Sequence, residues 1–275
     1  MTGPPDHYRR GSSVGLTADS IGVTGHMKRI LAALSLVSIV TLGLALGSVG
    51  QPDTTNILTP PSAVHWFGTD ALGRDLGLRL LQACALSLLV SGLAWAVALA
   101  VGIAIGATAA YIEVSPVARA IDELIAITYA TPFLVVLVGI LGLLGPGTVN
   151  AYVVLLLFAW AAPARHTMSI VRHLRNATHV RAVLALGFRP SQTIRFVLVP
   201  EVLPAVVTAS LSVLPEILAL DVALSFFGLG AQPPTPTIGG LLVDGLAYGT
   251  VAWWVVLFPV LFLSVICLLM RGLKI

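Results

Sequence analysis

Long apolar runs alternate with short polar segments along most of this chain. The runs cover residues 30–49, 81–111, 123–144, 149–164, 202–227 and 248–270. Most of them reach the ~20 residues that an α-helix needs to cross the hydrocarbon core of a bilayer. Their apolar residues are continuous rather than alternating, which favours helices over a transmembrane β-barrel. The pattern therefore predicts an all-α membrane protein with six transmembrane helices.

Composition supports the same class. The chain is 57% hydrophobic and only 10% charged, with a mean hydropathy of +0.97, whereas soluble domains carry roughly 25% charged residues. The net charge of +3 does not indicate a nucleic-acid partner, because the basic residues stand at the ends of the apolar runs. Cys84 and Cys267 lie inside apolar runs, so we expect packing residues rather than a disulfide or a metal pair.

The pattern divides the chain into three parts. Residues 1–26 are rich in Gly, Ser, Pro and Thr, and we predict a disordered cytoplasmic tail. Residues 27–80 hold the first helix and a proline-punctuated extracytoplasmic loop. Lys28 and Arg29 before the first apolar run resemble a secretory signal, but no small-residue cleavage site follows, which favours a retained helix. Residues 81–275 form a five-helix core with a basic loop at about 165–204.

The basic residues predict the orientation in the membrane. With the N-terminus inside and six spans, all 15 Lys and Arg except Arg74 and Arg79 fall on the inner side. Cytoplasmic loops are enriched in Lys and Arg. We therefore expect both termini in the cytoplasm.

Two features inside the apolar runs predict helix packing. Gly102 and Gly106 are four residues apart, a spacing that lets a second helix approach closely. Pro132 lies within a predicted span, where proline often marks a kink beside a cavity.

The basic loop at 165–204 has a structure of its own. It carries six arginines: Arg165, Arg172, Arg175, Arg181, Arg189 and Arg195. The sequence predicts a short helix from about Thr178, a glycine turn at Gly187, a second helix capped by Ser191, and a return to the membrane at Pro200. Such a projecting unit suits docking into a groove on another protein. The alternative is a loop that only obeys the orientation rule.

No catalytic motif was found in the sequence. It contains neither a Walker A sequence nor HExxH, and its glycines do not follow a strand with GxGxxG spacing. Three histidines are spread along the basic loop: His166, His173 and His179. We interpret them as polar residues of a helix rather than as ligands of a metal ion. We therefore expect no enzyme activity, no bound metal and no cofactor in this chain.

Three segments resemble one family. HWFGTDALGRDLGLRLLQACALSLLV at 65–90 is similar to the HxxGTDxxGRD segment of bacterial ABC-transporter permeases, namely the second permease of dipeptide, oligopeptide and nickel importers. ALSFFGLGAQPPTPTIGGLLVDG at 223–245 is similar to the LSFLGLGxQPPxP segment of the same family. The basic loop takes the place of the family's EAA loop, with Gly187, Ile194 and Pro200 at the matching positions. The resemblance covers roughly residues 30–270.

The resemblance implies a type I ABC importer permease fold and a transport function. This chain would pair with a second homologous permease in the bacterial inner membrane. Two ATPase subunits, or a fused ATPase, would bind ATP beneath it, and an extracytoplasmic binding protein would deliver the solute. The implied solute is a di- or oligopeptide, with nickel, a metal chelate or haem as alternatives.

The chain also departs from the family pattern. Arg181, Ala182 and Val183 stand where the family often has Glu-Ala-Ala, and Leu78-Arg79 stands where it has Ser-Arg. The GDGLRDxLDP segment of the family does not follow Arg271 in this sequence. These departures leave open a second hypothesis, an uncoupled channel or scaffold.

Two groups of residues are candidates for contact with solute or partners. Glu216, Asp221 and Phe226 lie in the fifth apolar run, where a carboxylate facing the pathway would attract a peptide amine or a metal cation. The alternative for Asp221 is a pair with a partner's arginine or a backbone cap. The second group is the extracytoplasmic motif Gly68, Thr69, Asp70, Gly73, Arg74 and Asp75. For its charged residues we expect a subunit or binding-protein contact, or a structural ion-pair cluster.

Overall fold

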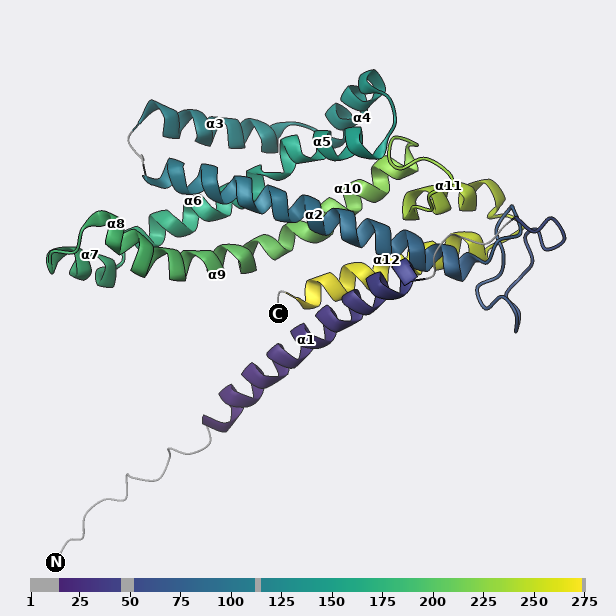
Figure 1. Cartoon of the computed structure of the whole chain (residues 1–275), viewed down its shortest axis with the longest axis horizontal. Helices are drawn as coiled ribbons and strands as arrows, with labels where there is room; N and C mark the ends of the chain where they lie inside the picture. The colour runs from purple at the N-terminus through teal and green to yellow at the C-terminus, as the bar shows by residue number, and fades with distance from the viewer. Residues whose placement is uncertain (1–14, 46–51, 112–114, 274–275) are drawn as a thin grey trace, which may run out of the picture.

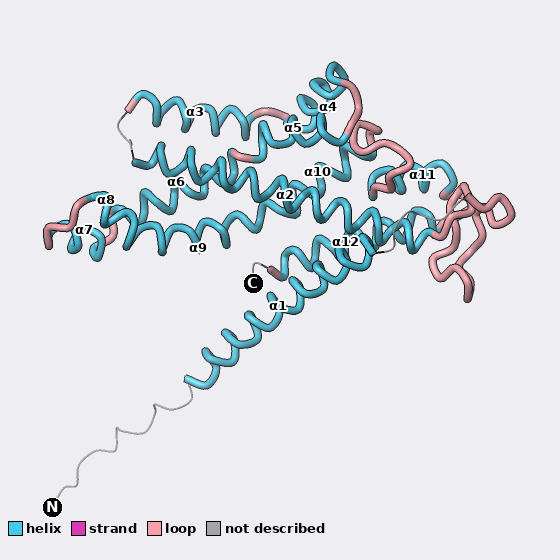
Figure 2. Tube along the Cα trace, viewed as in Figure 1, coloured by secondary structure: helices cyan, strands magenta, loops and turns pink. Residues whose placement is uncertain are grey.

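The computed structural model describes residues 15–45, 52–111 and 115–273, with the side chains of 15–28, 190 and 191 left out. This part of the chain is helical and holds no strand beyond an isolated bridge between Thr69 and Asp75 (Figure 2). Its α-helices are α1 Gly15–Ala45, α2 Leu76–Tyr111, α3 Pro116–Ala130, α4 Phe133–Leu144, α5 Thr148–Ala159, α6 Ala161–Arg175, α7 Thr178–Ala185, α8 Pro190–Thr193, α9 Val199–Ser210, α10 Leu214–Phe226, α11 Ile238–Tyr248 and α12 Trp254–Gly272.

Several of these helices combine into membrane-length segments. Four are long and apolar enough to span: Leu76–Tyr111, Thr148–Arg175, Ile194–Phe226 and Trp253–Gly272. The pair α3 and α4 is a fifth if it counts as one span, and the stretch Arg29–Ala45 of α1 is a shorter apolar helix. The chain is therefore a multi-pass membrane protein, and the number six stays a prediction.

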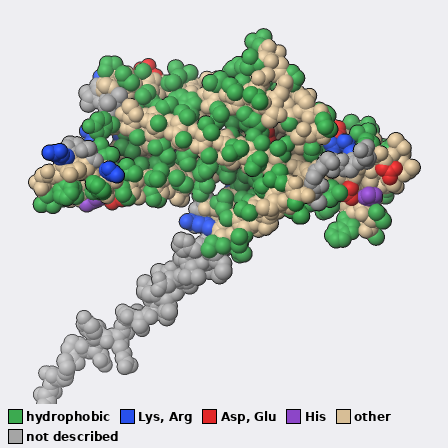
Figure 3. All heavy atoms as spheres, in the orientation of Figure 1, with side chains coloured by type: hydrophobic (Ala, Val, Ile, Leu, Met, Phe, Trp, Pro, Cys, Tyr) green, Lys and Arg blue, Asp and Glu red, His purple; other side chains and the backbone are tan. Residues whose placement is uncertain are grey.

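The long helices share one axis of the molecule. Figure 1 shows α2, α6, α9 and α10 along this axis, with α7 and α8 at one end and the loop of residues 52–75 at the other. Figure 3 shows most of the acidic, basic and histidine side chains on this face towards the two ends, with a largely apolar surface between them and one further basic group near the C-terminal end of α12. This distribution suits a bilayer, whose core excludes charge. We call the two ends the α7–α8 end and the loop end.

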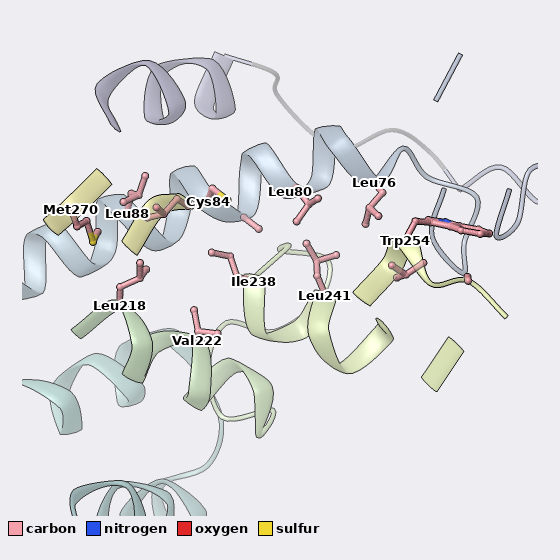
Figure 4. Packing of buried hydrophobic residues seen from close by; sticks show 14 residues of the cluster. Leu76, Leu80, Cys84, Leu88, Leu218, Val222, Ile238, Leu241, Trp254 and Met270 are labelled. Atoms are coloured by element: carbon pink, nitrogen blue, oxygen red, sulfur yellow. The ribbon is translucent and has the colours of Figure 1, made fainter. Parts of the chain in front are cut away.

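The largest apolar cluster joins α2 to the C-terminal helices. Leu76, Leu80, Cys84 and Leu88 follow each other at four-residue spacing, which places them on one face of α2. Figure 4 shows this face against α10, α11 and α12, through Leu218, Val222, Ile238, Leu241, Trp254 and Met270. Cys84 is a free, buried packing residue, as predicted.

The predicted glycine pair holds α2 against α6. A Cβ on Gly102 would collide with Pro163 and Ala164, and one on Gly106 would collide with Ala164 and Thr167. The prediction of a close helix approach at these glycines is thus confirmed, and the structure identifies α6 as the partner helix.

Helix α1 begins at Gly15, inside the predicted tail of residues 1–26, whose disorder stays a prediction; residues 1–14 lie outside the described part. Two other expectations need correction. The fourth span was expected to end at Ala164, but helix continues to Arg175. A kink within one helix was expected at Pro132. The helix is instead broken there into α3 and α4, whose axes differ by 88°, because Thr131 takes the extended conformation favoured before proline.

Candidate functional site

The predicted helix and glycine turn are present at the α7–α8 end. Helix α7 begins at Thr178, and Gly187 follows its end with φ of 88°, a left-handed conformation that favours glycine. The N–H of Gly187 donates to the carbonyl of Leu184 at 3.0 Å, and that of Phe188 donates to the carbonyl of Val183 at 3.4 Å. These two bonds form a Schellman motif, which ends α7 at a fixed angle.

The second helix begins earlier than predicted. Helix α8 starts at Pro190, so the expected N-cap role of Ser191 is wrong. Arg189 precedes the helix instead, and its backbone N–H donates to Oε1 of Gln192 at 3.0 Å, as in one half of a capping box. We call residues 176–193 the helix-turn unit.

The helix-turn unit leads into the span without a break at Pro200. Residues Ile194–Leu198 form a π-helical turn, in which the N–H of Val199 donates to the carbonyl of Ile194. Pro200 has no N–H to donate, and a wider turn before it avoids the clash of a regular α-helix. Ile194 also lines an apolar cavity of about 380 Å³ between α2, α6 and α9.

The helix-turn unit presents an apolar surface with basic residues around it. Leu184, Leu186 and Phe188 are 43%, 78% and 49% exposed. Arg181 and Ala182 are exposed as well, while Val183 is half-buried, and Arg181 donates weakly to Oδ1 of Asn176 at 3.4 Å. An exposed apolar patch at a charged end of the molecule is a surface on which a partner protein could dock.

A side-chain contact ties the unit to the span. His179 on α7 lies 3.2 Å from the carboxylate of Glu201 on α9. This contact and the continuous helix from Pro190 join the helix-turn unit to the bundle at two points.

At the loop end, Asp70 is the centre of an ion-pair cluster. Its carboxylate is almost fully buried and accepts from Nε of Arg74 at 2.8 Å and from Nη1 of Arg79. The backbone N–H groups of Leu72 and Arg74 donate to the same carboxylate at 2.8 and 2.9 Å. A buried carboxylate with this many donors is a structural group. The geometry therefore supports the ion-pair alternative for Asp70.

The other residues of the GTDxxGRD segment fix the loop around Asp70. Gly68 and Gly73 both have positive φ, and a Cβ on Gly73 would collide with the carbonyl of Asp53. Thr69 is buried and donates to the carbonyl of Asn56. Asp75 accepts from the N–H of Leu78, which caps α2, and from Nδ1 of His65 at 2.8 Å. The motif is thus the folded cap of α2.

A cavity of about 490 Å³ opens beside this cap and holds a residue that sequence reasoning missed. Phe226, Arg79 and Asp244 all line it. The carboxylate of Asp244 on α11 lies 3.7 Å from Nη1 of Arg79. Partial burial raises the pKa of Asp244, and nearby Arg79 opposes that rise. The signal in the sequence was an acidic residue within the short apolar segment 238–248.

Asp221 is satisfied within the bundle. It is 8% exposed on α10, and the phenol of Tyr152 on α5 donates to its Oδ1 at 2.8 Å. Ser87 on α2 is a further hydrogen-bond partner. Within this chain the Asp221 carboxylate therefore has two hydroxyl partners, and its pairing with an arginine of a partner chain stays a prediction.

Glu216 has a different environment five residues earlier. Its side chain is exposed and lines a cavity of about 210 Å³ where α3 breaks into α4. Thr128, Tyr129 and Phe133 from the break line the same cavity, with residues of α5, α6 and α10. The cavity that Pro132 predicted is therefore present, and Glu216 is its charged residue.

Comparison with known proteins identifies the family. The family model "Binding-protein-dependent transport system inner membrane component" matches residues 102–274. The chain is 31% identical to the "Dipeptide transport system permease protein DppC" of Bacillus subtilis, over 86% of this chain and 73% of that protein. It is 35% identical to the "Di/tripeptide transport system permease protein DppC" of Pseudomonas aeruginosa, over 78% of this chain and 74% of that protein.

A solved structure shows the same fold. A chain of the inward facing MetNI methionine ABC transporter superposes with a TM-score of 0.58 at 22% identity, over 71% of this chain and 93% of that chain. The helix order, the sequence motifs and these similarities agree. This chain belongs to the family of binding-protein-dependent transport system inner membrane components, and it has the type I ABC importer permease fold.

Proposed function

We propose that this chain is a transmembrane subunit of an ATP-driven importer for di- or oligopeptides. The observation that carries the proposal is the helix-turn unit, a fixed apolar projection at the end of the continuous helix Ile194–Phe226. The names of the similar permeases support the solute class.

The mechanism follows from how this unit is attached. A partner ATPase would bind the exposed Leu184, Leu186 and Phe188, and Arg181 would lie at the edge of that contact. Movement of the ATPase then shifts the unit, and the helix that continues from Pro190 carries the shift to α10. A binding protein would deliver the peptide at the opposite, loop end. The chain itself forms no covalent bond.

The orientation belongs to the same proposal. The α7–α8 end would face the cytoplasm, where ATP is available, and the loop end would face outward. Arg172, Arg175, Arg181, Arg189 and Arg195 then lie at or near the inner side, in accord with the enrichment of arginine there.

Reconstitution tests this function. The chain is co-expressed with its partner permease and ATPase subunits, purified as a complex and placed in proteoliposomes. We expect ATP-dependent uptake of a labelled dipeptide only when the binding protein is present, together with stimulation of ATP hydrolysis by the loaded binding protein. Uptake of nickel, a metal chelate or haem instead of peptide would refute the solute class. Solute flow without ATP would refute coupling and favour a channel.

A further inference from the structure

Two charged residues, Glu216 and Arg165, lie far from the ends of their spans and need surroundings other than lipid. Glu216 lies ten residues before Phe226 and Arg165 ten residues before Arg175, so each is about 15 Å from the end of its helix at 1.5 Å per residue. Both side chains are exposed on this chain. A charge facing lipid at this depth costs about 3 kcal/mol or more. The face that carries them therefore meets protein or a polar pathway.

The two charges share one aromatic neighbour. The guanidinium of Arg165 lies over the ring of Tyr129, 5.2 Å from its centroid. Glu216 and Tyr129 line the same cavity, and both charged groups act electrostatically on the phenol of Tyr129. Glu216 on α10 and Tyr129 on α3 thus line the cavity, while Arg165 on α6, which does not line it, lies beside them over the Tyr129 ring.

Neither charge is neutralised by a counter-ion in the described part of the chain. No ion pair joins Glu216 to Arg165, and neither has another ion-pair partner among the side chains that the structure describes. Asp221 in the same helix shows the contrast, because Tyr152 and Ser87 satisfy it. The charges of Glu216 and Arg165 are therefore available to pair with the opposite charges of a ligand.

The cavity beside Glu216 is too small to enclose a ligand by itself. Its volume of about 210 Å³ is below the roughly 300–1,000 Å³ of sites that enclose a ligand. Apolar residues such as Phe133 and Ile217 line the rest of it. One chain therefore supplies one wall, and a second permease chain would close the site.

We propose that Glu216, Arg165 and Tyr129 form one wall of an intramembrane subsite for a zwitterionic solute, in which Glu216 binds the ammonium group and Arg165 the carboxylate. The inference rests on the proposed peptide-import function and names where that solute is held during passage. Every unmodified linear dipeptide carries a charged amine at one end and a charged carboxylate at the other. The subsite would bind both termini and would not select among the side chains of the peptide.

The test measures solute moved per ATP hydrolysed in the reconstituted complex. The variants are Glu216→Gln and Arg165→Gln. The matched control is Glu123→Gln, an exposed acid on α3 that neither lines the cavity nor is one of the charged groups that act on Tyr129. We expect each subsite variant to lower the number of dipeptides imported per ATP about tenfold or more, the fold-change for one charge-assisted hydrogen bond. In both subsite variants, the rate of ATP hydrolysis stimulated by the loaded binding protein should stay within about twofold of wild type. For the control variant, both this rate and the number of dipeptides imported per ATP should stay within the same range.

A conservative variant separates charge from structure. Glu216→Asp keeps the carboxylate, and we expect it to retain most of the transport that Glu216→Gln loses. Unchanged transport per ATP in both Gln variants would overturn the subsite. So would a parallel fall of uptake and ATP hydrolysis, which indicates a structural role. If the wild-type complex imports no peptide at all, the proposed function fails instead, so the two failures are distinguishable.

Discussion

Two buried carboxylates show how single residues take different roles in one membrane protein. Asp70 meets two guanidinium groups and two backbone N–H groups at the loop end, whereas Asp221 meets the hydroxyls of Tyr152 and Ser87 inside the bundle. Breaking a buried ion pair leaves an uncompensated charge, while removing one hydroxyl leaves the second in place. The two acids should therefore respond differently to mutation.

Asp70→Asn is expected to lower the free energy of unfolding by about 3–5 kcal/mol, because it leaves Arg79 buried without its main counter-charge. Thermal unfolding of the purified complex measures the change. Asp244→Asn is the matched control, since its carboxylate is half-exposed and 3.7 Å from Arg79, and it should change stability by about 1 kcal/mol or less. Equal effects of both variants would contradict the central role of Asp70.

Tyr152→Phe is expected to lower stability by about 1–3 kcal/mol, because the buried Asp221 loses a donor. The same thermal measurement applies. Tyr248→Phe, at a tyrosine that is 40% exposed, is the control and should be nearly neutral. A neutral Tyr152→Phe would show that Ser87 alone satisfies the acid.

At the scale of elements, the contact of α2 with α6 depends on two missing side chains. Gly106→Val should destabilise the chain by about 1–3 kcal/mol or more, because the new atoms meet the backbone of Ala164. Gly92→Val on the same helix is the control, since nothing lies within 4 Å of a Cβ there. The yield of folded protein in detergent reports the difference. Similar yields for the two variants would contradict the close packing.

The turn between α7 and α8 makes a separate prediction. Gly187→Val should impair ATP-driven uptake while the protein still inserts, since left-handed backbone costs a non-glycine residue about 1–2 kcal/mol and no neighbour blocks the side chain. Gly187→Asn is the control, because asparagine tolerates this conformation. Uptake and membrane abundance are measured together. Normal uptake by the valine variant would place the critical turn elsewhere.

The sequence predicted some elements well because their signals are local. The start of α7, the turn at Gly187 and the Gly102–Gly106 contact all follow from residue type and spacing. The course of α6 past Arg165 could not be seen, because its polar half resembles a surface loop. The continuous helix through Pro200 was also missed, since the compensating π-helical turn depends on backbone geometry that residue type does not encode.

The candidate site was predictable only in part, because the contacts of its residues come from helices that are distant in the sequence. Sequence position identified Glu216 and Asp221 as intramembrane acids, but their neighbours come from α2, α3, α5 and α6. Which acid is satisfied and which opens into a cavity is a property of tertiary packing. Arg165 was assigned to the basic loop and gained a role only when α6 placed it beside Tyr129.

At the scale of the whole molecule, the two charged ends predict a topology. Val64 at the loop end and Leu186 at the α7–α8 end are 80% and 78% exposed. In intact cells that lack the partner ATPase, which would otherwise cover Leu186, a membrane-impermeant maleimide should label Val64→Cys but label Leu186→Cys only after permeabilisation. The parent chain is the control, because its cysteines lie within apolar helices. The reverse labelling pattern would contradict the proposed orientation.

The helical segment Ile194–Phe226, which includes a π-helical turn at Ile194–Leu198 and a 3₁₀ turn at Leu211–Val213, has a mechanical consequence. At 1.5 Å per residue, its 33 residues make a rod about 50 Å long, with the helix-turn unit at one end and the 490 Å³ cavity at the other. Glu216 lies along this rod, so in the proposed mechanism a tilt applied by an ATPase would move the acid and both ends together. The movement that alters access at the loop end would then also change the binding of the solute at Glu216.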